Sequence, residues 1–127
     1  MGETIHIPSC CYEIEEYIHG PNLQLTPQYN VIFFDGNDGA SRRVDLVYKA
    51  TRIVTNRAYL ISNNPQLSSD DHVLSLSDTV SSELSPLVYL PFVQLLSFIV
   101  SNDLHSIYQH PLLKEFRLSQ LQKRRIL

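Results

Sequence analysis

The stretch that decides the fold is Val31-Ile32-Phe33-Phe34-Asp35-Gly36-Asn37-Asp38-Gly39. Its four consecutive apolar residues predict a strand that is buried on both faces, as strands of parallel sheets are. The polar, glycine-containing run that follows predicts the loop at which this strand ends. The next segment, residues 41–56, predicts a helix, because apolar side chains recur there at helical spacing: Val44, Val47, Tyr48, Thr51 and Val54.

The same pattern of strand and helix continues on both sides of this stretch. Further strands are expected at residues 58–62 and 72–76, and a possible first strand at residues 4–10. Helices are expected at residues 12–19 and 84–104, with a loop at residues 21–30. Strands that alternate with helices predict an α/β fold with a parallel sheet and crossover helices. Only three or four strands can be counted, so the sheet is expected to be incomplete, with uncovered edges.

The expected helix at Leu84–Leu104 is apolar on nearly every face, which predicts that it is buried all round. Pro91 in its interior predicts a kink. Its apolar part, Leu87–Val100, is too short to cross a bilayer, so no membrane partner is expected. Because so few strands cannot cover this helix, the chain is expected to bury it against a second copy or a missing domain half.

Composition indicates one globular domain, since 43% of the 127 residues are hydrophobic and 18% are charged. The net charge is −3 and the basic residues are scattered, apart from Lys123-Arg124-Arg125, so no nucleic-acid partner is expected. Cys10 and Cys11 are the two cysteines and are adjacent, which favours reduced thiols and a cytoplasmic location. No basic segment of a signal peptide opens the chain.

Residues 12–21, which read Tyr-Glu-Ile-Glu-Glu-Tyr-Ile-His-Gly-Pro, carry the residues best suited to chemistry. Glu16 and His19 are three residues apart, so a helix places them on one face. Gly20 and Pro21 are expected to end that helix, with Gly20 in the left-handed conformation of a C-cap. A histidine at this position can exchange protons near neutral pH. The structural alternative is that His19 only stabilises the carboxyl end of the helix as a cation.

These residues resemble a known family. The segment from Glu3 to Pro21 is similar to the second half of a sugar isomerase (SIS) domain, closest to the fructosamine 6-phosphate deglycases and the isomerase domain of glucosamine-6-phosphate synthase. The separation of Glu3 from His19 and the His-Gly-Pro motif match that family, and residues 85–96 resemble its long C-terminal helix. The resemblance covers residues 1–118 and implies half of a three-layer αβα, flavodoxin-like domain, with residues 119–127 as a basic tail.

The resemblance implies aldose–ketose proton transfer on a phosphorylated sugar or sugar-amine. In this reading Glu3 is the base, His19 helps to open the sugar ring, and Glu16 orients the imidazole or raises its pKa. No cofactor is implied, and the other histidines show no metal-ligand spacing. Lys114 lies near a lysine of the synthase tail but out of register, so no role is carried over to it.

One departure from the family bears on what the chain can do alone. The serine-rich phosphate loop of the family has no counterpart in this chain, and Asp35 and Asp38 make the loop at residues 35–39 unsuited to phosphate. A partner chain that supplies the phosphate loop, a complementary SIS half, is therefore expected for catalysis. The other partner expected is a further copy of this chain in a homo-oligomer. The alternatives are a non-catalytic module that binds sugar phosphate or mediates assembly, and an inactive truncated remnant.

Overall fold

The computed structural model describes residues 8–77 and 80–104. The chain divides into two compact units, one of residues 11–90 and one that combines residues 1–10 with residues 91–127. The proposed base Glu3, Lys114, the boundary at residue 118 and the basic tail lie outside the described residues. So does most of the possible strand at residues 4–10, and its last three residues, 8–10, have no regular secondary structure.

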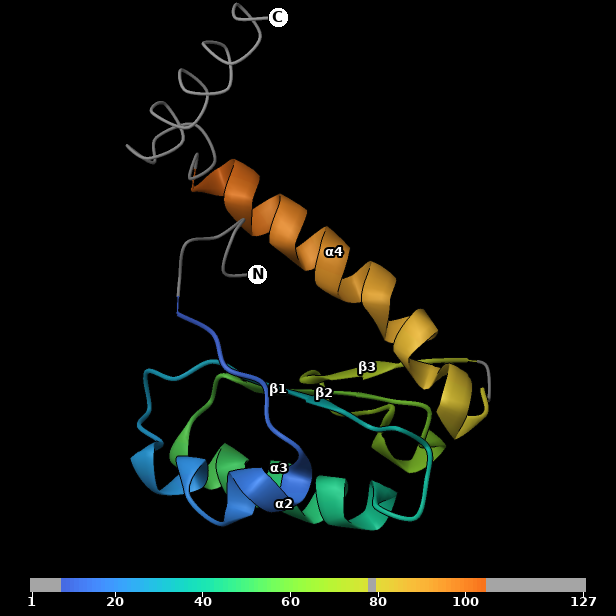
Figure 1. Cartoon of the computed structure of the whole chain (residues 1–127), viewed down its shortest axis with the longest axis horizontal. Coiled ribbons are helices and arrows are strands. Elements are labelled where there is room, and N and C mark those ends of the chain that lie inside the picture. The colour runs from blue at the N-terminus through green and yellow to red at the C-terminus, as the bar shows by residue number, and fades with distance from the viewer. Residues whose placement is uncertain (1–7, 78–79, 105–127) are drawn as a thin grey trace, which may run out of the picture. The chain divides into compact units, whose positions relative to one another are not determined.

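A three-stranded parallel sheet forms the centre of the first unit (Figure 1). Its strands are β1 (Val31–Phe34), β2 (Ala58–Ser62) and β3 (Val73–Ser75), in the order β1-β2-β3. Phe33 pairs with Leu60 in register, and Leu60 pairs with Val73. The predicted α/β parallel sheet is thus confirmed with three strands, and the central strand β2 is the most deeply buried.

Helices connect and cover these strands. They are α2 (Ile14–Ile18), α3 (Ser41–Val54) and α4 (Ser85–Asp103), together with the short 3-10 helices η1 (Pro21–Gln24), η2 (Pro65–Leu67) and η3 (Ser82–Leu84). Helices α2 and α3 lie on the same side of the sheet (Figure 1). The predicted bounds of β1 and β2 are correct, whereas α2, α3, α4 and β3 are shorter than predicted. The loop expected at residues 21–30 contains η1.

Phe33 is the centre of the core between the sheet and these two helices. Its ring meets the edges of Tyr17 from α2 and Tyr48 from α3, with centroid separations of 5.7 and 6.1 Å. Such edge-to-face pairs add to the stabilisation from burial itself. Phe34 points to the opposite face, because neighbouring strand residues alternate, and its ring packs 5.4 Å from that of Tyr89 in the first turns of α4. Helical residues therefore contact both faces of the sheet.

The prediction that α4 is buried all round is wrong for the described chain. Exposed apolar side chains recur at intervals of three or four residues along one face of α4, and 67% of the surface of Phe98 is exposed to solvent. By length and composition alone, Ser82–Asp103 would suffice to cross a membrane. Core helices of soluble proteins meet the same test, so this is weak evidence for a span. The helix extends beyond Leu87–Val100, so its length does not exclude a span, and the expectation of no membrane partner stays a prediction.

Candidate functional site

The His-Gly-Pro turn lies between α2 and η1. Helix α2 ends at Ile18, and His19 is its C-cap, with a backbone N–H that donates to Glu15 O at 3.2 Å. Gly20 has a φ of −171°, which is extended and not left-handed, so the predicted left-handed cap is wrong. The helix ends instead because Pro21 starts η1, where its fixed φ suits the first helical position.

Contacts with the core and with α3 hold α2 in place. The hydroxyl of Tyr17 hydrogen-bonds Thr51 Oγ1 at 3.2 Å, while the ring of Tyr17 packs on Phe33. Glu15 forms a two-point ion pair with Arg43, with distances of 2.9 and 3.0 Å. A helix of only five residues would not persist alone, so these contacts position the turn that follows it.

The structure describes two of the three predicted site residues, Glu16 and His19, and they have different surroundings. Glu3 lies outside the described residues. Glu16 is exposed, and its Oε2 accepts from the backbone N–H of Glu13 at 3.2 Å, at the start of the same helix. His19 is exposed at the other end, and within residues 8–77 and 80–104 no hydrogen bond or ion pair reaches its ring. The described contacts therefore tie Glu16 to Glu13 and not to His19.

A polar cluster that the sequence analysis did not identify lies at the carboxyl ends of β1 and β2. Asp35 is buried and accepts from Ser62 Oγ at 2.7 Å, from Ser41 Oγ at 2.5 Å and from the backbone N–H of Asn37 at 3.0 Å. Asn37 adopts a φ of 55°, a left-handed conformation that asparagine tolerates better than most residues. The carboxyl edge of a parallel sheet is where ligands bind in such folds, and that rule could have singled out Asp35 from the sequence.

The space beside this cluster is too small for a sugar. The cavity lined by Asn37, Ser85 and Tyr89 has a volume of about 10 Å³, roughly that of one water molecule. The Tyr89 hydroxyl donates to the carbonyl oxygen of Asp35. Burial raises the pKa of Tyr89, and the negative charges of Asp35 and Asp38 raise it further. Asp35 therefore acts in this structure as an acceptor that fixes the strand ends and the following loop.

A second cluster of polar residues lies at the opposite edge of the sheet. Tyr48 donates to Asp70 Oδ2 at 2.8 Å, and burial together with this bond raises the pKa of Tyr48. The backbone N–H of His72 donates to Asp70 Oδ1 at 2.9 Å and, with Tyr48, lowers the pKa of Asp70. The ring of His72 stacks on Tyr59, and Arg52 lies 3.0 Å from its Nδ1. Because arginine only donates, His72 accepts at Nδ1 in this arrangement.

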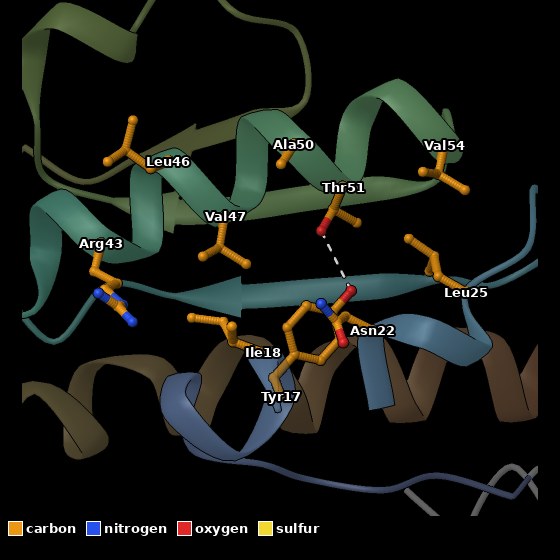
Figure 2. Close-up of a pocket in the computed structure, with 10 residues that line it drawn as sticks. All are labelled: Tyr17, Ile18, Asn22, Leu25, Arg43, Leu46, Val47, Ala50, Thr51 and Val54. Carbon is orange, nitrogen blue, oxygen red and sulfur yellow. Dashed lines mark hydrogen bonds between the residues drawn. The ribbon is translucent and has the colours of Figure 1, made fainter. Parts of the chain in front are cut away.

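A larger groove lies between α2, η1 and α3, as Figure 2 shows. Its volume is about 510 Å³, and its walls are mostly apolar. The lining residues are Tyr17, Ile18, Asn22, Leu25, Arg43, Leu46, Val47, Ala50, Thr51 and Val54. Ile18 lines it beside the His-Gly-Pro turn, but the groove offers few polar groups for a sugar phosphate.

Within the described part of the chain no three His, Cys, Asp or Glu side chains come together as metal ligands would. Comparisons with known proteins add no assignment: no protein-family model matches the chain, and no curated protein matches it significantly.

Proposed function

We propose that this chain supplies the histidine-bearing half of a site for a phosphorylated sugar, of the kind used by phosphosugar isomerases and fructosamine 6-phosphate deglycases. The observation that carries the proposal is the placement of His19. Its imidazole is exposed at the end of an anchored helix, directly before Gly20-Pro21, and no described group engages its ring. A histidine that is held in place but unpaired can meet a ligand.

The proposed chemistry assigns two proton transfers. His19 moves a proton between the anomeric hydroxyl and the ring oxygen, so that the carbon–oxygen bond of the ring breaks and the carbonyl forms. A carboxylate base then takes the proton from the carbon beside the carbonyl, and the carbonyl oxygen takes up a proton to give an enediol. The base returns its proton to the former carbonyl carbon while the other enediol hydroxyl loses its proton, so that the carbonyl forms at the neighbouring carbon. Glu3 is the proposed base. The contact of Glu16 with Glu13 supports a role in holding the first turn of α2, beside any effect on His19.

The phosphate of the sugar needs a binding element from elsewhere. The loop after β1 presents Asp35 and Asp38, which disfavour an anion, and the cavity beside it has a volume of only about 10 Å³. We therefore propose that a complementary SIS half, on a partner chain, supplies the phosphate loop. This partner is the complementary SIS half expected from the sequence. We propose that the two act in the cytoplasm, where phosphorylated sugars are metabolised.

A non-catalytic module is the second candidate function. In the described part of the chain, no carboxylate contacts the ring of His19. The Glu16 carboxylate accepts from the backbone N–H of Glu13, and Glu15 pairs with Arg43. This absence of an acidic partner favours the non-catalytic module. Such a module would bind sugar phosphate without turnover or would only mediate assembly.

Thermal unfolding with fructose 6-phosphate and glucosamine 6-phosphate tests the proposal, because a ligand of the native state raises its melting temperature. We expect a rise for the native chain that is lost in His19→Ala and kept in Gln24→Ala, a control on the exposed end of η1. Turnover of the bound sugar would favour the isomerase or deglycase. Binding without turnover would favour the non-catalytic module. The same rise with inorganic phosphate, or a rise that survives His19→Ala, would refute the assignment of His19.

A further inference from the structure

His72 joins the edge strand β3 to the end of α3. It directly precedes β3, and its Nδ1 lies 3.0 Å from Nη1 of Arg52, in the last turn of α3. Because an arginine side chain has no acceptor, Arg52 donates and the neutral imidazole accepts. The same Nη1 also contacts the backbone oxygen and the side-chain oxygen of Asn56, at 3.1 and 2.7 Å, and these contacts hold the guanidinium in place.

Charged and titratable groups surround the ring of His72. Arg52 reaches it from α3, and Tyr59 of β2 stacks on it with a centroid separation of 5.1 Å. In the loop before β3, Asp70 accepts from the backbone N–H of His72 at 2.9 Å, and the charges of the two residues interact. Tyr48 of α3 donates to the other carboxylate oxygen of Asp70. A proton on the ring would therefore meet one cation and one anion.

β3 is the shortest strand of the sheet and lies at its edge. It has three residues, it pairs with β2 alone, and Leu74 and Ser75 are exposed. At its start, the Leu60 N–H of β2 donates to the carbonyl oxygen of His72 at 3.0 Å. A short edge strand with few buried contacts opens locally more readily than the centre of a sheet. Side-chain contacts at the start of β3 therefore affect how often it opens.

We propose that His72 is a pH-dependent link between α3 and β3, which binds Arg52 as the neutral imidazole and releases it when the ring takes up a proton. Histidine changes its charge between about pH 8 and pH 5, and the proton enters at Nδ1, the nitrogen that accepts from Arg52. Two donors then face each other, and the contact breaks. Attraction between the imidazolium and Asp70 recovers part of the lost interaction, so the start of β3 opens more often while the sheet stays folded.

This link goes beyond the proposed sugar-phosphate function and does not depend on it. Amide hydrogen exchange of the Leu60 N–H tests it, because that N–H is released when the start of β3 opens. From about pH 7.5 to about pH 5.5 we expect its protection factor, corrected for the intrinsic exchange rate, to fall about threefold, a small effect for one hydrogen bond. The Asp35 N–H, which donates to Ile61 O, is the internal reference and should show no such step. An equal fall at Asp35, or a constant value at Leu60, would overturn the proposal.

His72→Gln separates this link from a general effect of acid. Glutamine can accept from Arg52 through its amide oxygen but takes up no proton, so the step at Leu60 should disappear. His19→Gln is the matched control and should keep the step. A step that survives His72→Gln, or that His19→Gln removes, would refute the role of His72.

The tautomer of His72 provides a test that needs no substitution. Because Nδ1 accepts from Arg52, the neutral imidazole carries its proton on Nε2. We expect the nitrogen chemical shifts of the ring, measured above the titration range, to show this tautomer, and we expect it to be less dominant in Arg52→Leu. A neutral ring with its proton on Nδ1, or the same tautomer balance in both chains, would contradict the contact on which the proposal rests.

Discussion

Asp35 shows how one buried side chain can fix the end of a sheet. Its carboxylate receives hydrogen bonds from Ser41, Ser62 and the backbone of Asn37, so it joins β1, β2 and the start of α3. Alanine at this position would leave three donors without their acceptor. The sequence could mark Asp35 as the end of a strand, but it could not show that two serines, one of them 27 residues away, converge on it.

We expect Asp35→Ala to lower the free energy of unfolding by roughly 2 to 4 kcal/mol, since several buried polar groups lose their partner. Urea denaturation measures the change. Asp71→Ala, at an exposed position, serves as the control and should change stability by less than about 0.5 kcal/mol. Equal effects of the two substitutions would show that the cluster around Asp35 does not contribute to stability.

Asp70 predicts an acid-dependent loss of stability. Hydrogen bonds from His72 N and Tyr48 lower its pKa below the ordinary value of 3.8, so the native state favours the carboxylate more than the unfolded state does. This contribution is present above pH 3.8 and disappears as the pH falls through the lower native value. We expect the melting-temperature difference between the native chain and Asp70→Asn to shrink below pH 3.8. Asp71→Asn is the control, and a difference that stays constant with pH would contradict this account.

At the residue scale, the predicted chemistry of the His-Gly-Pro turn was only partly accessible from the sequence. The spacing predicted that Glu16 and His19 lie on one short helix, and the structure places Glu16 at the centre of α2 and His19 at its C-cap. Spacing could not show that the Glu16 side chain turns to the amino end of α2 and accepts a hydrogen bond from the backbone N–H of Glu13. That N–H and the imidazole of His19 are both suitable partners for a carboxylate, and spacing does not decide between them. The predicted left-handed conformation of Gly20 was also wrong. The sequence could not show that η1 starts directly at Pro21, which leaves Gly20 extended.

At the scale of elements, strong patterns gave correct bounds. The apolar runs of β1 and β2 were located correctly because the loop residues after each run stop the strand. The stripe on α3 predicted the burial of Val44, Tyr48 and Thr51, but Val54 lies in the open groove. Periodicity identifies which face of a helix is apolar, but not whether a neighbour covers that face.

Helix α4 is the clearest case of this difference between composition and burial. Its composition predicted burial, yet Leu95, Phe98 and Ile99 are exposed in a single chain. We expect Leu95→Lys and Phe98→Lys to dissociate the assembly without loss of helical circular dichroism, because lysine is a good helix former. Ser82→Lys, at an exposed position in η3 away from this face of α4, is the control and should leave the assembly unchanged. Unfolding of the lysine variants, or an unchanged assembly, would contradict exposure of this face to a partner.

At the scale of the whole molecule, the three-stranded sheet is small for a fold of this class, and its described faces and helices leave apolar surface uncovered. Exposed apolar area of this kind marks interaction surfaces. We expect the chain to sediment as a dimer or larger assembly at micromolar concentration. A monomer under those conditions would contradict the assembly expected from the sequence.

The most direct test of the proposed function is nuclear magnetic resonance of the His19 imidazole during titration with fructose 6-phosphate. This method detects weak binding, which suits a site that lacks its own phosphate loop. We expect the His19 ring signals to shift progressively with fructose 6-phosphate and to remain in place with inorganic phosphate. The signals of His72, which directly precedes β3, should not change. His19 signals that stay unchanged up to millimolar sugar phosphate, or that respond equally to inorganic phosphate, would contradict the central claim.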